Sequence, residues 1–260
     1  VVASAKVDLL DEFNETIVVD INTVTKGTEL GGVNGQQKTI TNKDDDKTPY
    51  LTLILGSASV SEFGGSTTVK GSLSAVSGRD VTATLLVSGT ATNLEDFTVS
   101  GLTLSIPAGV AFSQITVTTV DDIFFEGVET VVFDVDTVEN AVEFGTQKKT
   151  LSIVDNEAAP LVSLSLASSS VIEDKGASST EIIASLSATS GVEVVVTLGK
   201  SGTALFLSDY KMDGTITIPV GKPSASVTFT SLQDEVDEEN ETVVVDILDI
   251  KNGTEKDGLQ

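Results

Sequence analysis

Short runs of apolar and β-branched residues, separated by turn residues, make up most of this chain. Several runs alternate apolar with polar positions, as residues 102–106 (LTLSI) do. Alternation is typical of a strand with one buried and one solvent-facing side, and no stretch has the 3.6-residue period of an amphipathic helix. We therefore predict an all-β fold. The complete set of seven strands is expected at residues 50–55, 67–73, 81–87, 102–106, 111–120, 130–136 and 149–154.

An acidic loop that leads into a strand occurs three times. Its shared motif is Glu-x-x-Glu-Thr, and the first Glu is residue 12, 126 and 238, spaced 114 and then 112 residues apart. A period of this size is that of a whole domain. The pattern predicts tandem immunoglobulin-like antiparallel β-sandwiches, with one complete repeat at residues 48–157.

The two end segments are expected to be partial repeats. Residues 1–47 are interpreted as the C-terminal half of a repeat, in which residues 1–7 correspond to the strand before the acidic loop. Residues 158–260 form a repeat without a counterpart of residues 148–155, its last strand. We expect the missing strand to lie outside this chain or to come from another segment, and the chain to be part of a longer protein.

The charge of the chain excludes several classes of function. A formal charge of −24 and a pI near 4.1 exclude an electrostatic surface for nucleic acid or anionic membrane, and favour divalent cations. The chain has no Cys and no His, so Cys/His zinc sites and histidine-based catalysis are impossible. No apolar run is long enough to span a membrane. We predict no enzymatic activity.

Acidic residues other than the loop glutamates also recur with the repeat. Glu62 is matched by Glu173, Asp96 by Asp209, and Asp122 by Asp8 and Asp234. Alternate loops of a sandwich share one end, so these carboxylates are expected to converge there. Crowded carboxylates repel one another unless a cation neutralises them, and Ca²⁺ accepts six to eight oxygen ligands in flexible geometry. The arrangement favours calcium over a solvated acidic surface.

Five motifs in order, Val60-Ser61-Glu62, Glu95-Asp96-Phe97, Ile106-Pro107-Ala108-Gly109, the acidic loop and Asp155-Asn156-Glu157, resemble the Calx-β domain. This family is an immunoglobulin-like sandwich of sodium–calcium exchangers, integrin tails and large bacterial surface proteins. The resemblance implies calcium at the end near the next domain. The implied ligands of the complete repeat are Glu62, Asp96, Asp122, Glu126 and Asp155, with Asp121 and Glu157 as candidates. Those of the other repeats are Glu173, Asp209, Asp234 and Glu238 in the third, and Asp8, Glu12, Asp44 and Asp45 in the first.

The resemblance implies a calcium-stabilised stalk or adhesive segment of a long extracellular, bacterial surface protein. Its partners would be neighbouring repeats of the same chain, and other surface proteins or glycans. Two other classes stay open. One is a calcium-sensing regulatory domain of a membrane protein, and the other is an accessory domain of an enzyme whose catalytic part lies elsewhere.

Overall fold

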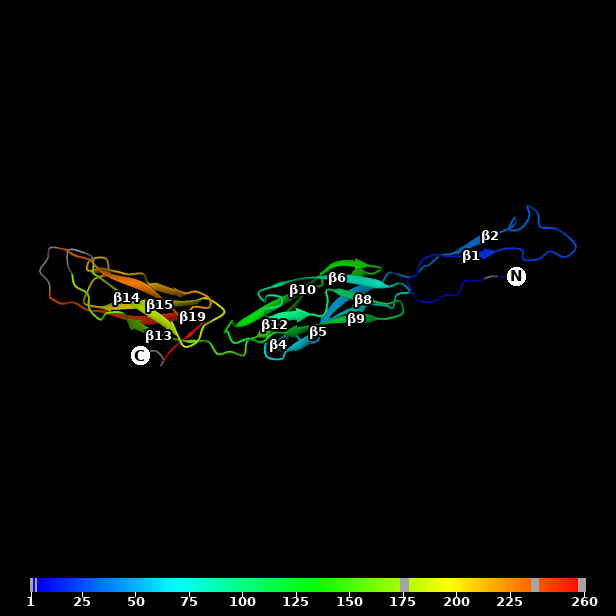
Figure 1. The fold of residues 1–260 in the computed structure, drawn as a ribbon. Helices are drawn as coiled ribbons and strands as arrows, with labels where there is room; N and C mark the ends of the chain where they lie inside the picture. Colours follow the sequence, from blue (N-terminus) through cyan, green and yellow to red (C-terminus); the bar gives the residue numbers. More distant parts are fainter. Residues whose placement is uncertain (1, 3, 174–177, 235–238, 257–260) are drawn as a thin grey trace. The chain divides into compact units, whose positions relative to one another are not determined.

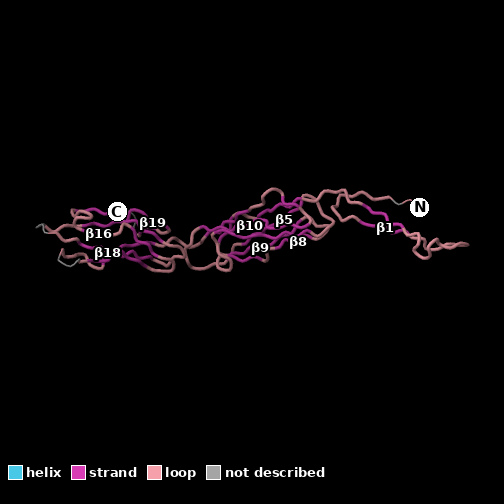
Figure 2. Tube along the Cα trace, turned by 90° about the horizontal axis from the view of Figure 1, so that it is seen from above, coloured by secondary structure: helices cyan, strands magenta, loops and turns pink. Residues whose placement is uncertain are grey.

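The computed structural model describes residues 2, 4–173, 178–234 and 239–256. Strands and loops make up this part of the chain, which contains no α-helix (Figure 2) and so no helix with the length and apolarity that a membrane crossing requires. The all-β prediction is confirmed. Contacts divide the chain into two compact units, each described by itself below. Unit 1 comprises Val1–Val60, Gly64–Val120 and Thr130–Ile153, and unit 2 comprises Ser61–Phe63, Asp121–Glu129 and Val154–Gln260.

The first two strands form a sheet of their own. β1 (Glu15–Val19) pairs antiparallel with β2 (Lys38–Asn42), with Ile17 opposite Ile40 (blue in Figure 1). Both isoleucine side chains are about half exposed, at 48% and 47%. A two-stranded sheet offers no second layer to pack against, so this pair buries no core.

The strand predicted at residues 1–7 is wrong for the part of this segment that the structure describes. Residues 4–7 have no strand partner and are exposed. In residues 48–157 the corresponding strand lies between two neighbours, β5 (Ser66–Leu73) and β7 (Phe97–Val99). Without neighbours to accept its backbone hydrogen bonds, an extended segment gains nothing over solvated chain.

Residues 50–154 form a sandwich of two five-stranded sheets (Figure 1). We call it the first sandwich. One sheet has the order β11-β3-β5-β9-β7, with β11 at Val142–Glu143, β3 at Tyr50–Leu55 and β9 at Phe112–Thr119. The other has the order β4-β12-β10-β6-β8, with β4 at Ser59–Ser61, β12 at Lys149–Val154, β10 at Val128–Glu139, β6 at Val81–Gly89 and β8 at Thr103–Ile106.

Alternate residues of these strands fill the core of the first sandwich. Leu51 on β3, Phe133 on β10 and Leu151 on β12 have no exposed surface, whereas their strand neighbours face outward. The side chain of Gln147, just before β12, crosses between the sheets and accepts a hydrogen bond from Leu53 N at 3.0 Å. The last strand therefore closes the core against the first.

All seven predicted strands form, with ends shifted by at most three residues, and three short strands are added: β4, β7 and β11. The long strands pair antiparallel, as predicted, and the short edge strand β11 is an exception. β11 pairs parallel with β3, with Val142 opposite Tyr50. The two-residue β11 is the start of the return toward β12, so the chain passes the edge of β3 in the same direction as β3 runs.

Residues 161–255 form the second sandwich, which lies within unit 2. Its core includes Val162, Ile182, Val196 and Ile218, each 1% exposed or less. One sheet has the order β16-β18-β14-β13-β20, with β16 at Tyr210–Lys211, β18 at Ser224–Ser231, β14 at Ser179–Leu186, β13 at Leu161–Leu166 and β20 at Thr254–Glu255. The other has three strands in the order β17-β15-β19, with β17 at Thr215–Ile218, β15 at Val194–Gly202 and β19 at Val243–Lys251.

Candidate metal site

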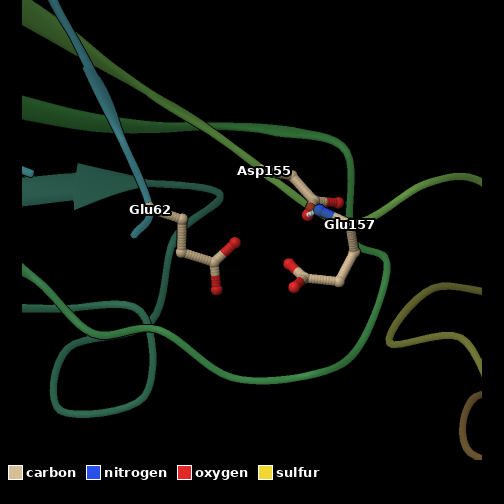
Figure 3. Close-up of side chains that lie close together, drawn as sticks. All are labelled: Glu62, Asp155 and Glu157. Atoms are coloured by element: carbon tan, nitrogen blue, oxygen red, sulfur yellow. Dashed lines mark hydrogen bonds between the residues drawn. The ribbon is translucent and has the colours of Figure 1, made fainter. Parts of the chain in front are cut away.

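Two strand ends bring three carboxylates together in unit 2. Glu62 follows β4 and Asp155 follows β12, and Glu62 N donates to Val154 O at 2.8 Å. The two side chains therefore leave adjacent strands at the same end of the sheet. Glu157 comes two residues after Asp155, and one carboxylate oxygen of each of the three lies within 4.8 Å of the others. Figure 3 shows the carboxylates of Glu62 and Glu157 turned toward one another, with Asp155 beside them.

Backbone hydrogen bonds fix the carboxylate of Asp155. Its Oδ2 accepts from the N–H groups of Glu126 and Gly127, both at 2.7 Å, and its Oδ1 accepts from Glu157 N at 2.8 Å. These bonds join the acidic loop to the segment after β12. Asp155 is thus a rigid member of the cluster, and its two oxygens are each already oriented by donors.

The surroundings of the cluster raise the pKa of its two glutamates. Burial, and then the negative charges of Asp155 and Glu157, raise the pKa of Glu62 to about 7, although a hydrogen bond from the backbone of Asp122 acts in the opposite direction. The pKa of Glu157 is also raised, first by burial and then by Asp155. Near neutral pH, the negatively charged carboxylates of the cluster therefore repel one another.

One carboxylate oxygen of the cluster is buried without a hydrogen-bond partner. Glu157 Oε2 is buried and has no hydrogen-bond partner among the described residues, whereas Glu157 Oε1 accepts from Asn156 Nδ2 at 2.8 Å. A buried carboxylate oxygen without a donor is costly. A cation bound between Glu62, Asp155 and Glu157 would give this oxygen a partner. A set of oxygen ligands suits a hard cation such as Ca²⁺. The residues present fit the ion that the sequence predicts.

The acidic loop surrounds this cluster. Asp122 and Asp121 lie close enough for their charges to raise the pKa of Glu157. Asp122 Oδ1 itself accepts from Phe124 N at 2.7 Å, which shapes the loop. Glu126 contributes its backbone N–H to Asp155, and its side chain lies over Gly191. The ligand roles of these three residues stay predictions.

Asp96 lies in unit 1, immediately before β7, and is 9% exposed. Its Oδ2 accepts from Thr92 N at 2.5 Å, while Val120 N donates to the backbone oxygen of Asp96 at 2.8 Å. In the second sandwich Asp209 is placed in the same way, since its Oδ2 accepts from Leu205 N at 2.5 Å. Both aspartates therefore organise a turn, and their ligand roles also stay predictions.

The N-terminal segment repeats the geometry of the cluster within unit 1. Asp44 Oδ2 accepts from Glu12 N at 3.2 Å, as Asp155 does from Glu126, and Asp44 Oδ1 accepts from Asp46 N at 3.4 Å. Burial, followed by Asp8 and other acidic neighbours, raises the pKa of Glu12. Asp8 Oδ1 accepts from Leu10 N at 3.1 Å, and Asp45 is exposed beside Asp44.

Asp46 follows the two ligands, Asp44 and Asp45, that the resemblance implies for this segment, but it was not itself among the implied ligands. Burial, and then Asp44 and Asp45, raise the pKa of Asp46, so it belongs to the acidic group of this segment. A signal was present, because Asp46 stands two residues after Asp44 as Glu157 stands two after Asp155.

In the second sandwich, the structure describes three of the four predicted ligands: Glu173, Asp209 and Asp234. Glu173 Oε1 accepts from Asp234 N at 3.2 Å, which brings these two predicted ligands together. Glu238 lies outside the described residues, so its predicted role has no structural counterpart here.

Two adjoining stretches match one family model. The Calx-beta domain model aligns with residues 44–157 and again with residues 155–260. The chain belongs to the Calx-beta domain family. The two matches overlap at Asp155–Glu157, so the three-residue segment that carries two of the clustered carboxylates ends one Calx-beta domain and begins the next.

Solved structures that match this chain include CBD12 from CALX1.2, at 18% identity and a TM-score of 0.36, covering 75% of this chain and 78% of that one. The calcium binding domain CBD12 of CALX1.1 is 18% identical, with a TM-score of 0.36 over 78% of this chain and 80% of that one. The apo-form Calx CBD1 domain is 22% identical, with a TM-score of 0.37 over 41% of this chain and 98% of that one. No curated protein matches this chain.

Proposed function

We propose that this chain is a calcium-binding segment whose ion ties the end of one Calx-beta domain to the start of the next. The observation that carries the proposal is the group of Glu62, Asp155 and Glu157, with ligand oxygens within 4.8 Å of one another. The buried, partnerless Glu157 Oε2 supports it further. When bound, the ion would supply the positive charge that the three carboxylates lack.

Each residue would have a distinct part. Asp155, held by three backbone donors, would present a preformed oxygen, while Glu62 and Glu157 would close on the ion from either side. Asp122 would add negative charge from the acidic loop. Glu126 and Asp121, which belong to the acidic loop, would complete the oxygen shell, as the sequence motifs imply.

The proposal is tested by calcium titration of the full chain with isothermal calorimetry. We expect binding that Asp155→Asn weakens by at least about tenfold, because one carboxylate charge that would contact the ion is lost. Asp213→Asn, an exposed acid elsewhere on the surface, is the matched control and should leave the affinity unchanged. Equal affinities for both variants, or the absence of heat with the unmodified chain, would contradict a site at this cluster.

We further propose that the segment acts as an extracellular stalk or adhesive array with its neighbouring repeats, and that other surface proteins or glycans bind the array. Support comes from the repetition of the Asp44 and Asp155 geometry, after β2 and again after β12, since one site per domain suits a structural ion better than a catalytic one. Surface labelling of intact cells that produce the full-length protein tests this. Labelling only after lysis would favour an intracellular regulatory domain instead.

A further inference from the structure

The outer face of one sheet of the first sandwich carries exposed aromatic rings. Tyr50 on β3 and Phe144, directly after β11, form an edge-to-face pair with ring centroids 5.6 Å apart, and they are 48% and 60% exposed. Phe112 on β9 of the same sheet is 46% exposed. Single exposed apolar residues are ordinary on a protein surface, whereas a group of them on one sheet indicates a binding surface.

The strand register places two of these rings at the ends of one row. Thr52 lies opposite Ser72, and Ser72 lies opposite Phe112. On the other side, the parallel register of β11 with β3 brings Phe144 beside Thr52. Three strand spacings, about 14 Å, separate the two phenylalanine backbones. We call Phe144, Thr52, Ser72 and Phe112 the aromatic row, which has a ring at each end and hydroxyl groups between.

The surroundings of the aromatic row contain no acidic residue. β3, β5, β7 and β9 have neither Asp nor Glu, although the chain has 39 of them, and Lys70 is their one charged residue. Lys70 Nζ lies 4.0 Å from the centroid of the Phe112 ring, and no ion pair holds it among the described residues. An uncharged partner rich in hydroxyl groups suits this face, because the net charge of −24 repels a polyanion.

The fold does not require these rings. In the second sandwich, equivalent backbone bonds and registers put Leu161, Ser224 and Lys256 at the places of the three aromatic residues. That sandwich forms the same sheet over a core of its own without a ring at any of them. Leu161 is 42% exposed although a complete repeat precedes it in the sequence, so this place is open in that repeat as well. The rings of the first sandwich therefore serve something other than packing.

Rings and hydroxyl groups in one row match the chemistry of a sugar chain. The face of an aromatic ring carries negative potential, to which the weakly positive C–H groups of a pyranose ring are attracted. Hydroxyl groups such as those of Thr52 and Ser72 both donate to and accept from sugar hydroxyls. A straight row across four strands requires an extended ligand, which β-linked glycans are and coiled α-linked glycans are not.

We propose that the aromatic row binds a neutral, extended β-linked glycan. Sugar rings stack on Phe112 and Phe144, and sugar hydroxyls bond to Thr52, Ser72 and Lys70 between them. This contact deepens the proposal that glycans bind the array and rests on it. It uses no carboxylate of the calcium cluster, so the calcium titration and the experiment below can fail independently of each other.

Saturation-transfer NMR of the full chain tests the contact, with cellohexaose, mannohexaose and xylohexaose as probes. Irradiation of the aromatic protons of the protein should transfer saturation to the C–H protons of at least one probe, because those protons would lie against the rings. Phe112→Ala and Phe144→Ala should each raise the Kd of that probe at least about tenfold, because each removes one stacked ring.

Phe206 provides a matched control. Its ring is 45% exposed, and Lys200 Nζ lies 4.0 Å from the ring centroid, so this pair repeats the Phe112 and Lys70 pair outside the aromatic row. Phe206→Ala should leave the Kd unchanged. Far-UV circular dichroism checks that each variant is folded.

A gain of binding gives a test that loss of folding cannot imitate. Ser163 and Ser185 already supply the hydroxyl groups of the equivalent row in the second sandwich. Leu161→Tyr, Ser224→Phe and Lys256→Phe together would add its rings, and calorimetry should then show a second glycan bound per chain. Stoichiometry that this variant leaves unchanged would contradict a site made by the rings.

Three further results would overturn the proposal. The first is the absence of saturation on all three probes, and the second is an equal Kd for Phe112→Ala and Phe206→Ala. The third is self-association of the unmodified chain in analytical ultracentrifugation that Phe112→Ala abolishes, because a second copy would then be the occupant of this face.

Discussion

The side chain of Glu126 lies so close to Gly191 that a Cβ at residue 191 would stand 2.5 Å from Glu126 Cγ. Beside this contact, Gly191 N and Ser190 Oγ both donate to Phe125 O at 3.0 Å. Unit 1 contains the same arrangement, in which a Cβ at residue 78 would stand 2.4 Å from Glu12 Cγ. The acidic loop thus meets a glycine in both units, and only a residue without a Cβ fits there.

Gly191→Ala should therefore destabilise the metal-free protein. The new Cβ has to displace the stem of Glu126, and such overpacking costs about 1–3 kcal/mol. Urea unfolding of the chain in chelator measures the change. Gly214→Ala is the control, because its Cβ would meet nothing nearer than Lys200 Nζ at 3.9 Å. Equal loss in the two variants would show that the contact with Glu126 has no special cost.

The raised pKa of Glu62 makes the stability of the metal-free protein fall as pH rises. Between the ordinary glutamate value of about 4.3 and about 7, folded Glu62 keeps a proton that the unfolded chain has released. The free energy of unfolding therefore decreases between these two pH values. Above about pH 7 the ionisation of Glu62 changes it no further. Thermal melts in chelator at pH 5, 6, 7 and 8 should show this decline, and Glu62→Gln should flatten it.

Calcium affinity should have the opposite dependence. The ion requires the ionised form of Glu62, so the apparent affinity should fall below pH 7, approaching about tenfold per pH unit. Calorimetric titrations at pH 5.5, 6.5 and 7.5 measure it. An affinity that is unchanged across this range would remove Glu62 from the ligand set.

Two neighbouring acids should respond oppositely in metal-free protein. Asp155→Ala removes three charge-assisted hydrogen bonds, each of a kind that contributes about 1.5–3 kcal/mol, and should lower the melting temperature markedly. Glu157→Gln removes a charge from the cluster and should raise the melting temperature. Melting curves in chelator separate them. If the two variants melt alike, repulsion within the cluster does not limit stability.

The only arginine, Arg79, should hold the N-terminal segment. Its guanidinium pairs with Asp11, which is 5% exposed, and lies over the Phe13 ring at 4.9 Å. Arg79→Ala would leave a buried carboxylate unpaired, a change that costs about 3–5 kcal/mol. Hydrogen exchange at Gly78, whose N–H donates to Asp11 O, should accelerate accordingly. Lys222→Ala, on an exposed turn, should leave that exchange rate unchanged.

Strands and strand-end carboxylates were predictable, but contacts between segments were not. Alternation around Leu104 and Ile106 predicted their burial, and the repeat spacing pointed to Glu62 and Asp155. The parallel pairing of β11 depends on where a loop passes an edge, which local pattern does not encode. Glu126 and Gly191 lie far apart in the sequence, so their close approach was not predictable. Glycine occurs in turns for several different structural reasons, and its presence at residue 191 therefore did not indicate this contact.

The bond between Gln147 and Leu53 N spans 94 residues and joins the segment just before the last strand of the first sandwich to the first strand. During synthesis, β3 leaves the ribosome long before Leu151 and Ile153 exist to cover its apolar side. Pairing between strands that are distant in the sequence is slow, and until it occurs the unpaired strand edges are exposed and prone to aggregation. During synthesis, a domain of this kind therefore cannot complete its core until its last strand has been made. A pause before residues 147–154 have left the ribosome would therefore leave the nascent chain most prone to aggregate.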